Sequence, residues 1–197
     1  NYHILALLVE HITGSSFQNF VTQQIITPLG LSNTFYKNEP GYPSPQGLPQ
    51  YYIDWDDNGQ LTNSPSVESK LIATTKGLNG MIATAEDYWK FAKALFRDNS
   101  LLKEPSVDFM KATSGSKGFH YGHGLEVSFT KNCPDRYGHK GGSQSGVYYY
   151  PEEDCFIVFL LNYSFNTGGS PIDKLANPAD EVGKNKTLLG EIEKCLF

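Results

Sequence analysis

The sequence predicts an α+β fold, in which an antiparallel sheet is flanked by helices. Helical periodicity dominates the first half of the chain up to about residue 112, and strand-like runs follow between residues 121 and 162. Runs of helices followed by runs of strands are typical of α+β domains and not of alternating parallel folds. With 39% hydrophobic residues, 12 Tyr and 12 Phe, the 197-residue chain has enough apolar surface for one core.

The predicted helices are identified by their apolar spacing and by the residues that begin and end them. The first covers Asn1–Ile12, whose apolar positions predict a helix buried on most of its surface, and Gly14 ends it. The others are predicted over residues 20–26 after a cap at Ser15 or Ser16, 85–96 after a cap at Thr84, 106–112 and 187–197.

Strands are predicted over Tyr121–Phe129, Arg136–Gly141, Ser145–Tyr150 and Cys155–Asn162, with a hairpin turn at 151–154. The run CFIVFLLN is apolar almost throughout, which favours a central strand covered on both faces. Residues 37–70 are rich in turn-forming residues and predict a long loop or insertion, with a short strand pair at 51–61. Residues 1–197 are therefore interpreted as a single partial domain.

Charge and cysteine content exclude several classes of protein. The net charge of −5 argues against nucleic acid as a partner, and no apolar run reaches transmembrane length. Three cysteines, at 133, 155 and 195, do not make a disulfide framework, and Cys155 is predicted to be a buried thiol. The chain enters a helical pattern at once, so its beginning is expected to lie elsewhere, as is any export signal.

The segment Tyr137-Gly138-His139-Lys140-Gly141-Gly142 is the strongest candidate for a site. Its glycines allow a ligand to approach the backbone, and an N–H beside a cationic side chain can hold an oxyanion or a carboxylate. The alternative is a strand that ends in a glycine-rich turn. His120 and His123 have a metal-like spacing, but residues three apart on a strand face opposite sides, so no metal site is predicted.

Taken together in their order, several segments resemble one family. These are NYHILALLVEHITG with the following PLGL, then GLNGMIATAEDYWKFAKAL, YGHGLEV, and GHKGG before an apolar strand ending in Asn. The set resembles the C-terminal part of the class C β-lactamase and D-alanyl-D-alanine carboxypeptidase superfamily, including its penicillin-binding and esterase-like members. The resemblance implies a β-lactamase/transpeptidase-like fold that is incomplete at its N-terminus.

The resemblance implies three catalytic elements, of which this sequence matches one. His139-Lys140-Gly141 matches the third element, a His-x-Gly motif on a strand that forms one wall of the substrate-binding site. The implied roles are substrate binding and orientation of a catalytic Tyr for His139, substrate binding for Lys140 and Gly141, and an oxyanion-hole N–H for Gly142. Lys140 departs from the hydroxyl residue that is commoner there. The Ser-x-x-Lys nucleophile and the Tyr-x-Asn motif are expected upstream, since the matches at 100–103, 114–117 and 36–38 fall in the wrong places.

The leading hypothesis is thus a fragment of a serine hydrolase that acts through an acyl-enzyme on D-Ala-D-Ala peptides, β-lactams or small esters, and that is inactive alone. The first alternative is a non-catalytic, penicillin-binding-like module that recognises cell-wall peptide or a protein partner. The second is an unrelated α+β binding domain. No cofactor or metal is expected. Self-association through the open sheet is expected, and the family implies an extracellular or cell-envelope location.

Overall fold

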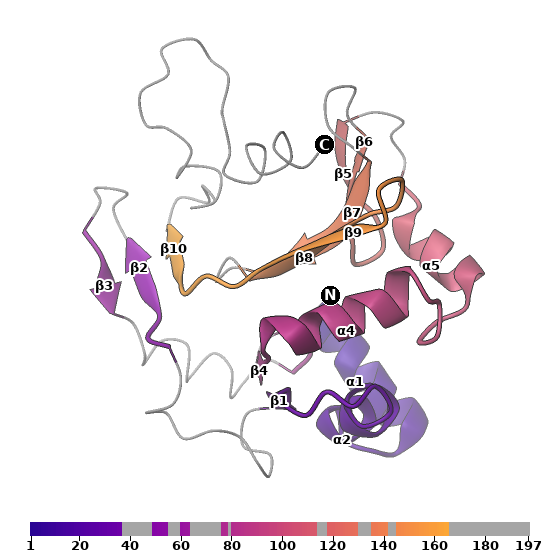
Figure 1. The fold of residues 1–197 in the computed structure, drawn as a ribbon. Coiled ribbons are helices and arrows are strands. Elements are labelled where there is room, and N and C mark those ends of the chain that lie inside the picture. The colour runs from indigo at the N-terminus through magenta and orange to yellow at the C-terminus, as the bar shows by residue number, and fades with distance from the viewer. Residues whose placement is uncertain are drawn as a thin grey trace. The chain divides into compact units, whose positions relative to one another are not determined.

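Two compact units make up the chain in the computed structural model, one from residues 1–50 and 64–101 and the other from 51–63 and 102–197. The structure describes residues 1–36, 49–54, 60–63, 76–78, 80–113, 118–129, 135–141 and 145–165. The predicted helix at 187–197, most of the 37–70 segment, Cys133 and Cys195 lie outside these residues. Most helices lie in the first unit and a five-stranded antiparallel sheet lies in the second, which confirms the α+β class (Figure 1).

The first unit begins with two helices whose ends the sequence predicts well. Helix α1 spans Tyr2–Thr13 and ends at Gly14, which is left-handed at φ 67° and donates its N–H to the Glu10 carbonyl. Helix α2 spans Phe17–Val21, and the Ser16 hydroxyl caps it by accepting from the Asn19 N–H at 3.2 Å. The chain continues as a π-helical turn, η1, over Thr22–Ile26. The predicted second helix is therefore present and begins at the predicted cap, and its second half forms a π-helical turn.

A small apolar core joins these helices to the rest of the first unit. Its buried members are Val21, Ile26, Leu31 and Tyr36, with Phe17, Phe20, Ile25, Leu29 and Phe91 packed around them. Tyr36 belongs to strand β1, Phe35–Tyr36, which pairs antiparallel with β4, Met81–Ile82. Phe91 belongs to helix α4, Ala85–Phe96, which begins after Thr84 as predicted. Burial raises the pKa of the Tyr36 phenol to about 12.

Asp87, in the first turn of α4, has a larger role than its sequence position indicates. Acids in that turn are predicted to interact with the helix dipole, but the Asp87 side chain is only 1% exposed. Its Oδ2 accepts hydrogen bonds from the backbone N–H of Asn33 at 2.7 Å and from the Thr34 hydroxyl at 3.0 Å. Asp87 therefore attaches the segment before β1 to the start of α4.

Helix α1 is not buried on most of its surface, so that prediction was wrong. Only Ala6 is buried, against Gly77, where a Cβ would lie 2.8 Å from the Ala6 methyl group. Gly77 also has φ +74°, which favours glycine in its own right. Large apolar side chains of α1 are exposed, among them Ile4 at 67% and Ile12 at 72%. Periodicity shows which positions are apolar, but it does not show which other element covers them.

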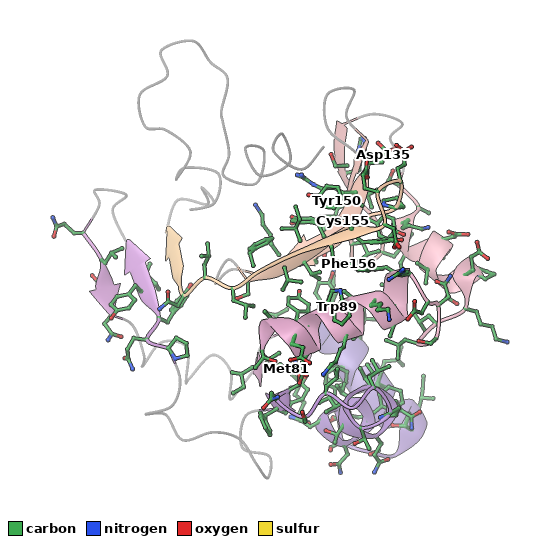
Figure 2. The ribbon with its side chains drawn as sticks, in the orientation of Figure 1. Met81, Trp89, Asp135, Tyr150, Cys155 and Phe156 are labelled. Atoms are coloured by element: carbon green, nitrogen blue, oxygen red, sulfur yellow. The ribbon has the colours of Figure 1, made fainter. Side chains whose placement is uncertain are left out.

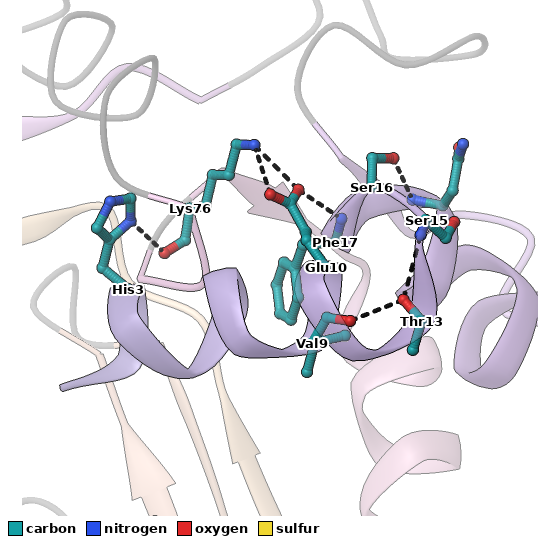
Figure 3. A network of polar contacts seen from close by, with 9 residues as sticks. His3, Val9, Glu10, Thr13, Ser15, Ser16, Phe17 and Lys76 are labelled. Atoms are coloured by element: carbon teal, nitrogen blue, oxygen red, sulfur yellow. Dashed lines mark hydrogen bonds and ion pairs between the residues drawn. The ribbon is translucent and has the colours of Figure 1, made fainter.

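One carboxylate on α1 holds three segments of the first unit together (Figure 3). The Glu10 carboxylate accepts a hydrogen bond from the Phe17 N–H at 2.8 Å. It also forms an ion pair with Lys76, whose Nζ lies 2.9 Å from Oε1. His3 Nδ1 lies 3.2 Å from the Lys76 carbonyl. The hydrogen bond from Phe17, followed by the one from Lys76, holds the pKa of Glu10 below its ordinary value of 4.5.

This network predicts a pH dependence of stability. Because the folded-state pKa of Glu10 is lowered, its ionised form stabilises the fold above the ordinary pKa, and this contribution is lost as pH falls through the folded-state value. Glu10→Gln removes the titration and keeps the shape of the side chain. We expect urea unfolding to show wild type more stable than Glu10→Gln at about pH 7 and a smaller difference at about pH 3. A difference that stays constant with pH would contradict this role.

The second unit contains the main sheet, whose five strands follow one another antiparallel in chain order. They are β5 Gly118–Tyr121, β6 Glu126–Phe129, β7 Arg136–Lys140, β8 Gly146–Tyr150 and β9 Cys155–Phe159. Helix α5, Glu104–Lys111, precedes them (Figure 1). A second sheet has the order β10-β2-β3, with β2 Tyr52–Asp54, β3 Thr62–Asn63 and β10 Tyr163–Phe165; β2 and β3 are the strand pair predicted near 51–61.

Two strand predictions need correction. Residues 121–129 form no single strand, because Gly122 donates its N–H to the Leu125 carbonyl at 2.8 Å and closes a turn between β5 and β6. The run from Cys155 forms an edge strand within the described sheet, and β9 is half-buried along its length. The fully buried strand is β8, where Tyr150 is 0% exposed. Cys155 is a half-buried free thiol near Tyr150 at the β8–β9 hairpin (Figure 2).

Candidate functional site

The predicted His-Lys-Gly segment lies on β7, the middle strand of the five-stranded sheet. Its preceding glycine, Gly138, is buried and pairs with Tyr148 on β8. A Cβ at Gly138 would lie 1.9 Å from the Val147 carbonyl oxygen and 2.9 Å from the Tyr148 Cα. Glycine is thus required here for the close approach of β7 and β8, and this approach sets the position of His139.

His139 pairs in register with Val147 and is half-buried. Its Nε2 lies 2.9 Å from the hydroxyl of Tyr121, the last residue of β5, and the two rings meet edge to face at 5.6 Å. Strand β6 lies between the strands that carry these residues. The sequence prediction did not identify Tyr121, although it stands directly before the glycine-containing turn, in the segment YGHGLEV.

The other predicted site residues follow His139 along β7 and into the loop after it. Lys140 pairs with Gly146, and its Cβ lies close to that glycine. Because adjacent residues of a strand point to opposite faces, the side chains of Lys140 and His139 leave β7 on different sides. The Gly141 N–H donates to the Ser145 carbonyl at 2.8 Å, so this amide is used within the loop. Gly142, the predicted oxyanion donor, lies outside the described residues.

Tyr137 marks the other end of the face that carries His139. Its ring meets Tyr149 edge to face at 5.6 Å, and the Lys111 ammonium lies 5.0 Å from its centroid. Burial, with a smaller contribution from the neighbouring Tyr149, raises the pKa of Tyr137 to about 12. A hollow of the second unit is lined by Asp108, Lys111, Ala112, Thr113, Asp135, Tyr137 and Pro151, and neither His139 nor Lys140 lines it.

The opposite face of the sheet holds a buried polar contact that the sequence prediction missed. The Tyr148 hydroxyl donates to the carboxylate of Glu126, which is 9% exposed, and the Arg136 guanidinium lies 4.9 Å from the Tyr148 ring. Burial, together with the hydrogen bond to Glu126, raises the pKa of Tyr148 above its ordinary value of 10. This contact joins β6 to β8 across Gly138 and stabilises the strands on both sides of the predicted site.

The remaining sequence motifs have structural roles where the structure describes them. His123 Nδ1 lies 2.9 Å from the Phe109 carbonyl, and its ring stacks on Phe109 at 4.1 Å, so it caps the end of α5. Ser100 donates its N–H to the Ala94 carbonyl just after α4 and opens no helix. Within the described stretches, no group of three metal-binding side chains lies together, and no helix is long and apolar enough to cross a membrane.

Known proteins of similar structure share this arrangement of elements. The octameric penicillin-binding protein homologue from Pyrococcus abyssi matches with a TM-score of 0.67 at 21% identity, over 86% of this chain and 38% of its own. The D-amino acid amidase from Ochrobactrum anthropi matches with a TM-score of 0.62 at 21% identity, over 83% and 49%. Simvastatin synthase (LovD) from Aspergillus terreus matches with a TM-score of 0.66 at 18% identity, over 82% and 48%.

These similarities establish the fold, and the chain spans about half or less of the length of each of these proteins. The family is established by the sequence itself. A family model described as Beta-lactamase matches residues 1–177, which includes the whole of the first unit, most of the second and the whole of the candidate site. The resemblance seen in the ordered sequence motifs is thereby confirmed, and this chain belongs to the Beta-lactamase family.

Proposed function

We propose that this chain supplies the substrate-binding wall of a serine hydrolase that works through an acyl-enzyme on D-Ala-D-Ala peptides, β-lactams or small esters. The observation that carries the proposal is His139 on the middle strand of the sheet, with its ring held by Tyr121. The proteins of similar structure are an amidase, a penicillin-binding protein homologue and a synthase, and this supports substrates with a transferable acyl group.

The nucleophile, in this proposal, comes from polypeptide outside the 197 residues. Ser100 follows a helix instead of opening one, and its Ser-x-x-Lys match is the one that the structure describes from end to end. We expect no covalent labelling when the chain alone is incubated with a fluorescent penicillin and run on a denaturing gel. A labelled band that resists boiling would show a nucleophile within this chain and contradict this part of the proposal.

Non-covalent binding of a ligand directly tests the proposed substrate-binding wall at His139 and Lys140. We expect an acyl-D-Ala-D-Ala peptide, a β-lactam or a small ester to shift the backbone amide signals of His139 and Lys140 in NMR titrations of this chain. His139→Ala should weaken that binding about tenfold or more, because it removes a polar contact to the ligand. His11→Ala is the matched control, since His11 is exposed on α1 in the other unit. Equal binding by both variants would exclude His139 from the site.

The alternative function is a non-catalytic module that recognises cell-wall peptide or a protein partner. Among the described residues no Ser-x-x-Lys opens a helix, and this is compatible with both functions. The two functions differ in the longer protein that contains this chain. Covalent labelling of that protein by the penicillin supports the hydrolase, whereas reversible binding without labelling supports the module. We also propose an extracellular or cell-envelope location, which fractionation of cells that express the longer protein would test.

Self-association belongs to the same proposal. Within the described sheet, β5 and β9 are edge strands, and unpaired strand edges can pair with other chains. The exposed apolar side chains of α1 add a second adhesive surface. We expect sedimentation velocity to show species heavier than the 21.9 kDa monomer at micromolar concentrations. A single monomeric boundary over the whole concentration range would contradict this expectation.

A further inference from the structure

The contact between Tyr121 and His139 brings together residues from two strands that are not neighbours in the sheet. Tyr121 ends β5 and His139 lies on β7, with β6 between these strands, and the Tyr121 hydroxyl lies 2.9 Å from Nε2. The rings are nearly perpendicular, with an interplanar angle of 82°. The edge-to-face contact restrains the plane of the imidazole. The hydrogen bond engages Nε2 and leaves Nδ1 without this partner.

The chemistry of the two groups decides the direction of this hydrogen bond. A phenol is a stronger acid than the N–H of a neutral imidazole, and an unprotonated imidazole nitrogen is a stronger acceptor than a phenol oxygen. The favoured arrangement therefore has the Tyr121 hydroxyl donating to Nε2. A neutral His139 then carries its proton on Nδ1, the reverse of the tautomer that imidazole side chains ordinarily prefer in water.

Packing alone does not account for the contact. Tyr121 is 49% exposed, so much of its ring remains in water and its hydroxyl could be solvated without any protein partner. Among the described residues, the His139 ring makes one hydrogen bond, which joins its Nε2 to Tyr121. Nδ1 is thereby left as the nitrogen that can act on a ligand.

We propose that Tyr121 is a positioning residue for His139, which orients the imidazole through Nε2 and selects the Nδ1–H tautomer, so that Nδ1–H is the donor presented to an oxygen of the substrate. The ligand atoms that suit this donor are a carbonyl oxygen or a carboxylate oxygen of an acyl peptide. The role of Nδ1–H toward a substrate rests on the proposed function, whereas the tautomer and the role of Tyr121 do not.

Nitrogen NMR of this chain tests the tautomer without any ligand. With ¹⁵N-labelled histidine at about pH 8, where an imidazole is ordinarily neutral, long-range ¹H–¹⁵N spectra distinguish protonated from unprotonated ring nitrogens. The His139 signals are assigned by their loss in His139→Gln. We expect a protonated-type shift for Nδ1 and an unprotonated-type shift for Nε2 in the wild-type chain. A protonated Nε2 in the wild type would overturn the proposal, and this measurement needs no destabilising substitution.

Tyr121→Phe tests the cause, because it removes the hydroxyl and keeps the ring. We expect this variant to fold, to lose the Nδ1–H preference and to show the Nε2–H tautomer or a mixture. Tyr2→Phe is the matched control, since Tyr2 is a partly exposed tyrosine of α1 in the other unit, and it should leave the His139 signals unchanged. Identical His139 signals in Tyr121→Phe and wild type would overturn the positioning role.

A binding measurement separates this inference from the proposed function. We expect affinity for an acyl-D-Ala-D-Ala peptide to fall about five- to tenfold in Tyr121→Phe, and to fall no further when the substitution is added to His139→Ala. If the wild-type chain binds no such peptide, the proposed function fails while the tautomer result stands. If Tyr121→Phe still weakens binding when His139 is absent, Tyr121 acts on the ligand directly and the positioning role is contradicted.

Discussion

Gly138→Ala is expected to destabilise the second unit by about 3 kcal/mol or more, which makes it one of the two largest single effects that this structure predicts. The added methyl group would lie 1.9 Å from the Val147 carbonyl oxygen, and backbone cannot move aside as a flexible side chain can. The two central strands must therefore separate. We expect urea unfolding to show the loss of stability, and the backbone amide signals of His139 and Val147 to move.

Gly141→Ala is the matched control, three residues along the same segment. The nearest atom to its added Cβ would be the Ser145 carbonyl oxygen at 3.8 Å, and Gly141 does not have a positive φ. We expect a change in the free energy of unfolding within about 0.5 kcal/mol. Equal losses for the two variants would mean that glycine is needed for the conformation of the whole segment and not for the approach of β7 to β8.

The second large effect is expected in the first unit, for Asp87→Ala. The substitution removes the acceptor of the Asn33 N–H and the Thr34 hydroxyl, both bonded to one charged oxygen. Hydrogen bonds to a buried charged group each contribute about 1.5–3 kcal/mol, so we expect a loss of about 3 kcal/mol or more in the free energy of unfolding. Chemical denaturation followed by tryptophan fluorescence measures it, because Trp89, one of the two tryptophans of the chain, lies on the same helix.

Glu86→Ala provides the comparison for Asp87→Ala, because both carboxylates pair with Lys90. The Glu86 side chain is 71% exposed, and an exposed ion pair of this kind contributes less than about 1 kcal/mol. We expect the stability of Glu86→Ala to lie close to that of wild type. If Glu86→Ala cost as much as Asp87→Ala, the ion pair with Lys90 would be the main interaction and the attachment of residues 33 and 34 a minor one.

The fold could be predicted where local chemistry decides it. Gly14, Ser16 and Thr84 end or begin helices where predicted, because capping depends on a few neighbouring residues. The exposure of α1 and the edge position of β9 could not be predicted, because they depend on which other elements cover them. The long run of apolar residues that begins at Cys155 would look the same in a buried strand and in an edge strand.

The candidate site could be predicted in its backbone and not in its side-chain partners. Gly138 and His139 are recognised from the glycine-rich pattern and the ordered motifs around them. Tyr121 and Glu126 are not, because they belong to other strands of the sheet, β5 and β6, and no spacing along the chain encodes the register between strands. Lys140 shows the converse, since it is adjacent to His139 in sequence but points to the other face of the sheet.

The carboxylate of Glu10 has a consequence for local unfolding. One side chain joins α1, the start of α2 and the segment at Lys76, so none of the three can open without breaking a bond to the same two oxygens. Such segments are expected to open together as one cooperative unit. The Phe17 amide hydrogen should then exchange with solvent at the rate of that whole unit and not at the faster rate of a frayed helix end, which makes this proton a reporter for the opening of α1, the start of α2 and the segment at Lys76.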